Sequence, residues 1–230
     1  MSSVITHKVS AVPQAQTKIK APADTGSPGR SKSEQKGRQI LEAAGSLFMS
    51  EGYGAVSMEQ VARAAGVSKQ TVYSHYGSKE ALFSAAVEQK CVDYEISYHS
   101  GDDERPVREY LREFIQHFSD LVTSEAGVAI HRVCIAEADK RSKLAELFWE
   151  AGPHPIMLRL TAYLEAQVKR GTLDIDHIHF AADQLLFMVK SDVHMRGVLG
   201  LPTEESEKDL PAYLDSCLDV FMKAYGATGG

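Results

Sequence analysis

The sequence predicts an all-α fold for this chain of 230 residues. Apolar residues recur every three or four positions through most of it, which is the period of an amphipathic helix. Serine, glycine and proline stand at the ends of these runs, where they cap or stop helices. No alternating run or hairpin signal lies between them. With 43% hydrophobic and 24% charged residues, the chain can bury the core of one or two globular domains.

Residues 1–35 are predicted to form a disordered basic arm. This segment holds several prolines and glycines and no aromatic residue, so it cannot bury enough apolar surface to offset the entropy cost of ordering. Residues 1–37 carry 6 basic and 2 acidic side chains. Two interpretations stay open: a tail without a role in binding, or an arm that contacts DNA phosphates.

The first two helices are predicted from spacing and caps. From Arg38 onward apolar residues follow helical spacing, and Gly52 ends the run. Ser57 then opens the sequence S-M-E-Q, a capping box in which the serine hydroxyl and the Gln60 side chain satisfy each other's backbone amides. The second helix is expected from Met58 to about Ala65.

A third short helix follows after a tight turn. Gly66 stops the second helix, and Ser68 can cap a helix from Lys69 to about Tyr76. Gly77 ends it, and Ser78 caps a fourth helix. Two short helices joined by a turn that contains glycine form the helix-turn-helix arrangement. Residues 36–82 are therefore predicted to be a three-helix helix-turn-helix DNA-binding domain.

The third helix has the features of a helix that reads DNA. Lys69 and Gln70 lie in its first turn, where lysine can donate to guanine and glutamine can pair with adenine in the major groove. Thr71 and Tyr73 offer hydroxyl groups. Lys79, in the first turn of the fourth helix, is placed to hold a phosphate together with the free amides of that helix start. The alternative is a surface helix of an ordinary bundle whose polar side chains are only solvated.

The remainder of the chain, residues 83–230, is predicted to be an α-helical bundle. A proline at 106 suits the first position of a helix, and another at 211 suggests a kink or a restart. The expected later helices are Gly127–Ala138, Ser142–Glu150, Ile156–Lys169 after a break at Gly152 and Pro153, a helix of about 24 residues capped by Asp176 that ends near Leu199, and Glu204–Tyr225.

The charge is distributed unevenly. The formal net charge is −6, but residues 1–90 sum to +4 and residues 91–230 to −10. Attraction to a polyanion therefore resides in the leading segment and in a few placed side chains, and the acidic remainder limits indiscriminate binding.

Several classes of protein are disfavoured. No uncharged stretch is long enough to span a bilayer, and Met1 to Ser10 lacks the pattern of a signal peptide, so a cytoplasmic protein without membrane contact is expected. The three cysteines lie far apart without a C-x-x-C motif. His177 and His179 point to different sides of a helix start, so neither a metal nor another cofactor is predicted. No motif of a known enzyme class is present.

The segment Arg38 to Phe83 resembles the TetR/AcrR family of transcriptional regulators. The resemblance is carried by G-V-S-K-Q-T-V-Y-S-H-Y-G-S-K-E-A-L at Gly66 to Leu82. Tyr76 stands where phenylalanine is commoner, which adds a hydroxyl that needs a partner. Glu59 and Gln60 stand where some relatives carry a basic contact. Taken with the chemistry above, the predicted DNA-binding residues are Arg38, Ser57, Ser68, Lys69, Gln70, Thr71, Tyr73, His75, Tyr76 and Lys79.

The region Ala136 to Leu201 resembles the C-terminal domain of an AefR-like branch of that family. The resemblance to the TetR family implies that residues 83–230 are a ligand-binding and dimerisation bundle. Such proteins form a homodimer that pairs through the last two long helices, for which the candidates are Leu186, Val189, Leu214, Leu218 and Phe221. The resemblance also implies an effector pocket between helices, for which the candidates are Phe114, His117, Phe118, His131, Phe148, Trp149, Met157 and Met188. Ordinary core packing is the alternative for every residue of both sets.

The function expected from these features is a ligand-responsive repressor of the TetR type. It would bind an inverted-repeat operator in double-stranded DNA and be released by a small apolar or aromatic effector. The resemblance to the AefR-like branch suggests control of efflux or transport genes. The alternatives are an activator of the same fold, a helical module that no longer binds DNA, and a small enzyme.

Overall fold

The computed structural model describes residues 28–96, 103–138 and 143–227, with side chains from residue 32 onward. Within these residues the chain forms ten α-helices and no β-strand. In chain order they are α1 (Pro28–Glu51), α2 (Met58–Ala64), α3 (Lys69–Tyr76), α4 (Lys79–Asp93), α5 (Val107–Thr123), α6 (Glu125–Glu137), α7 (Leu144–Ala151), α8 (Pro153–Lys169), α9 (Ile178–Leu199) and α10 (Glu204–Tyr225).

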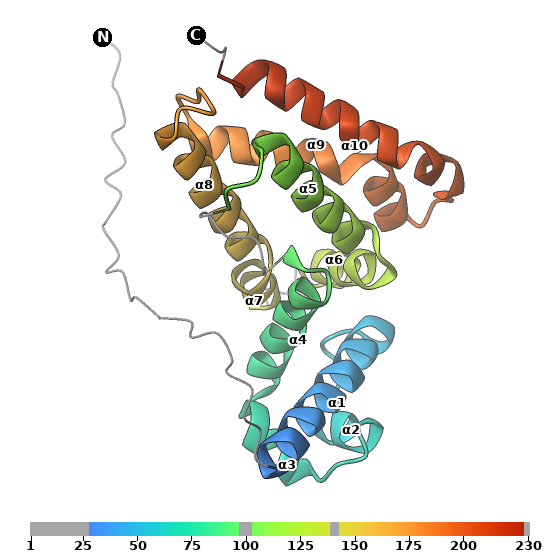
Figure 1. Cartoon of the computed structure of the whole chain (residues 1–230). Helices are drawn as coiled ribbons and strands as arrows, with labels where there is room; N and C mark the ends of the chain where they lie inside the picture. Colours follow the sequence, from blue (N-terminus) through green and yellow to red (C-terminus); the bar gives the residue numbers. More distant parts are fainter. Residues whose placement is uncertain (1–27, 97–102, 139–142, 228–230) are drawn as a thin grey trace, which may run out of the picture.

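The helices form two connected parts (Figure 1). Helices α1, α2 and α3 make the lower end, α4 leads upward from it, and α5 to α10 form the upper bundle, with α9 and α10 side by side across the top. The predicted all-α class, a helix-turn-helix part followed by a helical bundle, is thereby confirmed. Among the described helices, none combines the length and the apolar character that a membrane span requires.

The caps predicted for the N-terminal helices are present. The Ser57 amide donates to Gln60 Oε1 at 2.7 Å while the Gln60 amide donates to Ser57 Oγ at 3.2 Å, which completes the capping box of α2. Ser68 and Ser78 cap α3 and α4 by accepting backbone amides. Gly66 adopts a φ of 65°, a left-handed conformation that lets the chain turn sharply between α2 and α3.

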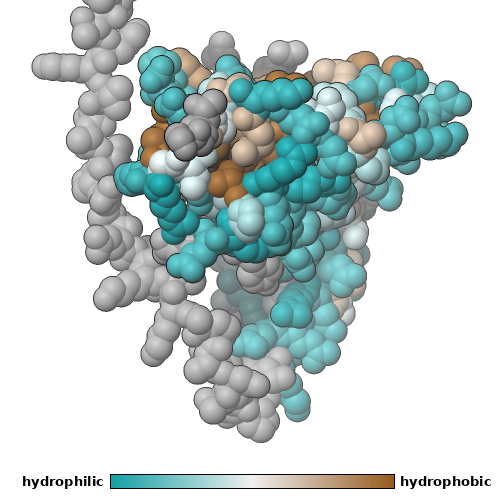
Figure 2. Space-filling view, turned by 45° about the horizontal axis from the view of Figure 1, so that its top comes forward, coloured by the Kyte–Doolittle hydropathy of each residue, from teal (hydrophilic) through white to brown (hydrophobic). Residues whose placement is uncertain are grey.

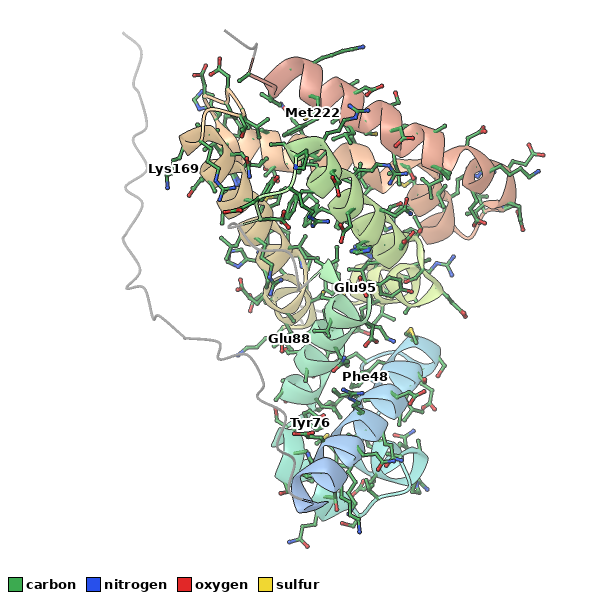
Figure 3. All side chains as sticks on the ribbon, in the orientation of Figure 1. Phe48, Tyr76, Glu88, Glu95, Lys169 and Met222 are labelled. Atoms are coloured by element: carbon green, nitrogen blue, oxygen red, sulfur yellow. The ribbon has the colours of Figure 1, made fainter. Side chains whose placement is uncertain are left out.

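The N-terminal core joins α1 to α4 through aromatic rings. Phe48 and Phe83 are almost completely buried, with ring centroids 5.5 Å apart in an edge-to-face arrangement, and Tyr53 packs on both. Figure 3 shows Phe48 where α1 meets α4. Leu144 of α7 belongs to the same core. The predicted boundary between residues 82 and 83 therefore falls inside one continuous helix whose side chains serve both parts.

Helix α1 begins earlier than the sequence predicts. It starts at Pro28, so the expectation of disorder is wrong for residues 28–35. Proline suits the first helical position because its missing amide has no partner there, and the serine, lysine, glutamate and glutamine that follow suit an exposed helix surface. Residues 1–27 of the predicted arm lie outside the described residues.

Prolines and caps in the bundle differ in detail from the predictions. Pro153 begins α8 instead of breaking the chain, because the first turn of a helix needs no amide from it. Pro106 is the capping residue of α5, not its first residue. His177, not Asp176, precedes α9. Pro211 does not restart the last helix, since α10 continues through it.

Helix α9 contains a break that the sequence does not announce. Ser191 has φ 58° and ψ 177°, a backbone conformation that almost only glycine adopts without strain. Its hydroxyl oxygen is buried without a hydrogen-bond partner among the described residues. Packing on both sides of the break holds it in place, because Val189 and Val193 are both buried.

Replacing Ser191 by glycine is expected to stabilise the protein. The change relieves the positive-φ strain, which costs of the order of 1–3 kcal/mol, and removes an unsatisfied hydroxyl, so the free energy of unfolding should rise by about 1 kcal/mol. Urea unfolding at one fixed protein concentration measures it. Ser191→Ala removes the hydroxyl but keeps the strain and should gain less. A Ser191→Gly protein that is less stable, as for glycine in an ordinary helix, would contradict this account.

Candidate nucleic-acid interface and ligand cavity

Helix α3 presents a polar face to solvent at the lower end of the molecule (Figure 1). Val72 is fully buried and anchors the helix, whereas Lys69 and Gln70 are exposed and Tyr73 is 44% exposed. The predicted division of α3 into one inward residue and outward polar residues is confirmed. A helix of eight residues whose first-turn side chains are exposed to solvent can enter the major groove of a duplex.

Two serines predicted to contact DNA hold the starts of helices. Ser57 Oγ donates to Gln60 Oε1 at 2.8 Å, in addition to its capping bond. Ser68 Oγ accepts from the Thr71 amide at 3.1 Å and shares a hydrogen bond with Thr71 Oγ1 at 2.8 Å. The Ser57 bonds order the first turn of α2 and the Ser68 bonds that of α3, and contact of the same hydroxyls with a duplex stays a prediction.

Lys69 forms an ion pair with Glu59 of α2. Each group stabilises the charged form of the other, so the pKa of Glu59 is lowered and the pKa of Lys69 is raised. Both side chains are more than half exposed. Water screens such a pair, and the lysine can therefore exchange the carboxylate for a phosphate or a base edge at little cost.

Lys79 rests on an aromatic ring at the start of α4. Its Nζ lies 4.3 Å from the centroid of the Tyr53 ring and donates to the Gly54 carbonyl oxygen at 3.5 Å. Burial lowers the pKa of Lys79, and the neighbouring Glu80 partly offsets this effect. The amine is half-buried, and its predicted role of holding a phosphate requires it to turn away from the ring.

Tyr76 is the clearest departure from the predicted DNA contacts. Its hydroxyl donates to the Gly37 carbonyl oxygen at 3.0 Å, which ties α3 to α1 (Figure 3). The additional hydroxyl therefore finds its partner inside the domain, and contact of Tyr76 with a duplex stays a prediction. His75 is half-buried beside the Tyr76 ring, with centroids 6.0 Å apart, and Arg38 is exposed on α1.

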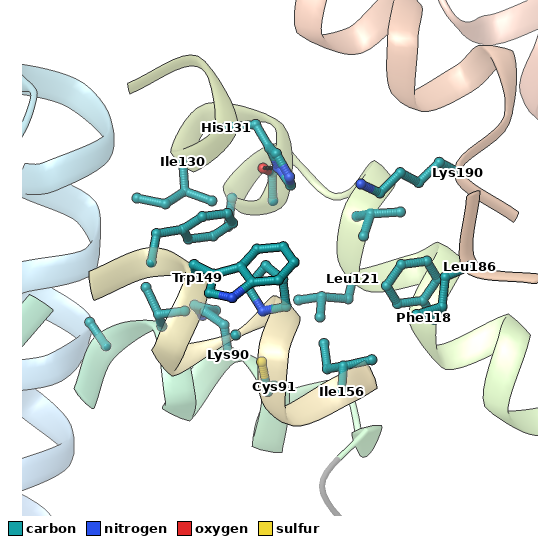
Figure 4. Close-up of a pocket in the computed structure, with 18 of the residues that line it drawn as sticks. Lys90, Cys91, Phe118, Leu121, Ile130, His131, Trp149, Ile156, Leu186 and Lys190 are labelled. Carbon is teal, nitrogen blue, oxygen red and sulfur yellow. Dashed lines mark hydrogen bonds between the residues drawn. The ribbon is translucent and has the colours of Figure 1, made fainter. Parts of the chain in front are cut away.

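An open, mostly apolar cavity of about 160 Å³ lies where the lower end meets the bundle. Helices α1 and α4 supply part of its wall, including Phe48, Met49 and Val87, and α5 to α9 supply the rest. Figure 4 shows Trp149, His131 and Lys190 around the space at its centre. A small apolar molecule would touch both parts of the protein at once.

Five of the predicted ligand-binding residues line this cavity, and three do not. Those in the wall are Phe118, His131, Phe148, Trp149 and Met157. Phe114 is fully buried in the bundle core, and Met188 packs against that core. His117 lies apart from the cavity, with its Nε2 3.6 Å from a carboxylate oxygen of Glu95. Helical spacing could not show which apolar faces meet at an empty space.

Sequence reasoning missed the residues of α1 and α4 in the wall. Phe48, Met49 and Val87 read as ordinary core positions of an N-terminal domain, and only the docking of that domain on α6 and α7 opens them to the cavity. Lys190 was missed because a lysine in an amphipathic helix is normally solvated. No signal in the sequence singled out either group.

The predicted dimer residues are wrong. Leu186, Val189, Leu214, Leu218 and Phe221 are all buried within this single chain, and Leu186 also lines the cavity. They form the contact between α9, α10 and the rest of the bundle, so they have no surface left for a partner. The exposed apolar residues on these two helices are Phe180, Phe187, Met195, Leu199, Tyr213 and Val220.

Two histidines pack together beside the cavity. His131 Nδ1 donates to the Gly127 carbonyl oxygen at 2.7 Å and His194 Nδ1 to the Val122 carbonyl oxygen at 2.9 Å. Their rings meet edge to face, with centroids 4.8 Å apart. Burial lowers the pKa of both side chains, because the charged form is poorly solvated there, and the charge of Lys190 lowers both further.

Two regions of the chain match known protein families. Residues 40–86 match the family described as bacterial regulatory proteins, tetR family. Residues 109–227, slightly more than half of the chain, match the C-terminal domain of AefR-like transcriptional repressors.

Similar proteins share the fold along most of its length. A TetR-family transcriptional regulator from Mesorhizobium loti is 25% identical, with a TM-score of 0.68, over 85% of this chain and 98% of the other. The flavonoid-responsive regulator FrrA is 31% identical, with a TM-score of 0.63, over 85% of this chain and 100% of FrrA. The uncharacterized HTH-type transcriptional regulator YdeS of Bacillus subtilis is 28% identical over 148 residues, 63% of this chain and 71% of YdeS.

The histidine pair is expected to make stability depend on pH below neutrality. Above the pKa of about 6.5 that histidine has in the unfolded chain, the two side chains are neutral in both the folded and the unfolded state. Below it, they bind protons in the unfolded chain but remain neutral in the folded one. The free energy of unfolding therefore falls as the pH falls. Urea unfolding at about pH 7.5 and 5.5 measures the slope. His194→Gln should be less stable at both values but show a shallower slope than the wild type. If the free energy of unfolding changed equally with pH in the wild type and in His194→Gln, the pH dependence would not come from His194.

Proposed function

Because the chain belongs to the TetR family of bacterial regulatory proteins, we propose that it is a dimeric, ligand-responsive transcriptional repressor. It binds an inverted-repeat operator through α3 and leaves the operator when a small apolar or aromatic effector occupies the cavity. The description of the matched C-terminal domain, an AefR-like repressor, supports repression as the sign of the regulation.

The observation that carries the proposal is the shared wall of the cavity. Phe48 and Met49 of α1 and Val87 of α4 line it together with Phe118 and Trp149 of the bundle. Helix α4 starts at Lys79, beside the candidate DNA surface, and lines the cavity at positions from Phe83 to Cys91. An effector that fits best when α1 and α4 have shifted would favour that arrangement and move α3 away from the groove.

The chemistry of the wall supports an apolar or aromatic effector. Aromatic rings and aliphatic side chains dominate it, and such walls bind small molecules through burial of apolar surface. The similar protein FrrA is named for its response to flavonoids, which are aromatic. The resemblance to the AefR-like branch supports efflux or transport genes as the target.

A dimer is supported by the outer surface of α9 and α10. Figure 2 shows groups of apolar residues among hydrophilic ones over the upper part of the molecule. Phe187, Met195, Tyr213 and Val220 are each more than two-fifths exposed. Exposed apolar groups close together on one surface favour burial against a partner. Independently, reading an inverted repeat needs two copies of α3 about 34 Å apart.

DNA binding tests the proposal directly. Selection from a random duplex library should enrich an inverted repeat, and affinity for it should fall at least about tenfold as salt rises from about 50 to 200 mM. Gln70→Ala should weaken binding to the selected site by about 1–3 kcal/mol, because Gln70 loses a base contact. Glu165→Ala, an exposed change on α8, serves as the control. If no sequence is enriched and binding ignores salt, the proposal fails.

Release by an effector has its own measurement. Trp149 is the single tryptophan of the chain and lines the cavity, so its fluorescence reports occupancy without a label. Within a panel of small aromatic compounds that includes a flavonoid, those that change this fluorescence should also lower operator affinity. Compounds that fill the cavity and leave operator affinity unchanged would contradict the coupling.

The dimer surface can be disrupted by one charge. Val220→Arg places a cation on the exposed apolar face of α10 and should convert a dimer to a monomer in light scattering, with loss of operator binding. Leu158→Arg makes the same change at an exposed position of α8 and should leave the dimer intact. Dissociation by both variants, or by neither, would count against this surface.

A further inference from the structure

Lys190 introduces a positive charge into the apolar wall of the cavity. It lies on α9, and Figure 4 shows its side chain extending toward the space between His131 and Phe118. Its ammonium group lies 4.9 Å from the centroid of the Phe187 ring. Among the described residues no carboxylate pairs with it. Burial lowers the pKa of Lys190, as expected for an ammonium group with little access to water.

The other charged residues of the wall already have partners. Lys90 Nζ is 3.1 Å from a carboxylate oxygen of Asp93. Asp183 Oδ2 lies 3.4 Å from Nε2 of His179 on the same helix. The charge of Lys90 is therefore balanced locally, Asp183 has a neighbour on its own helix, and Lys190 forms no ion pair with a carboxylate of the described residues.

The histidines do not supply a counter-charge. His131 and His194 each use Nδ1 to donate to a backbone carbonyl, so each presents a neutral ring beside the cavity. Lys190 is close enough to both rings for its charge to act on their protonation. Lys190 therefore carries the positive charge beside these two rings, and no ion pair with a carboxylate is found for it among the described side chains.

A half-buried cation without a counter-ion is unfavourable in apolar surroundings, and a bound anion reduces that cost. The apolar surroundings strengthen the attraction between opposite charges, but they penalise each additional charge that must leave water. One negative charge matches one lysine, whereas a phosphate group would bring a second charge into an apolar wall. The apolar remainder of the ligand would face Phe118, Phe148 and Trp149.

We propose that the effector is an aromatic or apolar acid whose single negatively charged oxygen group pairs with Lys190. This inference rests on the proposed function, because it specifies which apolar molecules the cavity selects. It assigns Lys190 as the residue that distinguishes an acid from a neutral molecule of the same shape.

Hydrocinnamate and hydrocinnamamide test the inference. The two probes have nearly the same shape and differ in charge. Titration against Trp149 fluorescence in the full-length protein should show that hydrocinnamate binds more tightly by about tenfold or more, as expected for a hydrogen bond between charged groups. Lys190→Met should reduce the affinity for hydrocinnamate by a similar factor and leave hydrocinnamamide binding unchanged. Lys190→Arg should keep the preference for the acid.

Each other outcome overturns the inference. If the wild-type protein binds the amide as tightly as the acid, or if Lys190→Met keeps the preference for the acid, Lys190 does not read the charge. In both cases the proposed function still stands if the amide binds in the cavity and its binding lowers the affinity for the operator. Failure of both probes to bind overturns the inference and also counts against an aromatic effector. Unchanged amide binding by Lys190→Met shows that the variant is folded.

Discussion

The packing of α1 on α4 is the contact on which the other features depend. Phe48 and Phe83 bury their rings against each other, with Tyr53 on both, and this cluster connects the short helices of the lower end to a helix that continues into the bundle. The same Phe48 and Phe83 line the cavity. The rings are tightly packed against one another. If a ligand enlarged the space beside them, small side-chain shifts would not be enough to accommodate it, and α1 and α4 would have to move together. The position of α3 follows from both helices, since Tyr76 is tied to Gly37 in α1 and Ser78 joins α3 directly to α4.

Two lysine side chains of this protein lie in different surroundings, one on the exposed surface of α3 and one in the cavity wall. At the lower end, Lys69 and Glu59 are exposed and paired, so water can replace either partner and the lysine is free to exchange. In the cavity, Lys190 has little access to water and no carboxylate beside it among the described residues. The first arrangement suits contact with a long polyanion, where many weak exchanges add up. The second suits a small ligand, where one charge in apolar surroundings discriminates strongly.

Helix α9 serves three structural purposes within 22 residues. Leu186 lies in the cavity wall and the core, Phe187 lies at the exposed edge of the same wall, and Met195 is exposed on the outer surface. The break at Ser191 lies next to Lys190 and changes the direction of the chain between the cavity and the last exposed turn. A conformation that only glycine adopts easily persists there because the buried residues on both sides determine the path of the backbone.

The sequence by itself determined the all-α class, the caps of α2, α3 and α4, the helix-turn-helix and the outward face of α3. These depend on contacts between residues close together in the chain: the capping box of Ser57 and Gln60 and the turn at Gly66 are complete within a few residues. Tertiary structure decided what each apolar face meets. Leu214 and Leu218 have the helical spacing expected of a dimer interface, but they are buried in the core of the chain. Periodicity cannot distinguish an interface from a core, because both require an apolar stripe along a helix. The cavity, the partner of the Tyr76 hydroxyl, the break at Ser191 and the unpaired state of Lys190 arise from the meeting of helices far apart in the chain, where no local rule applies.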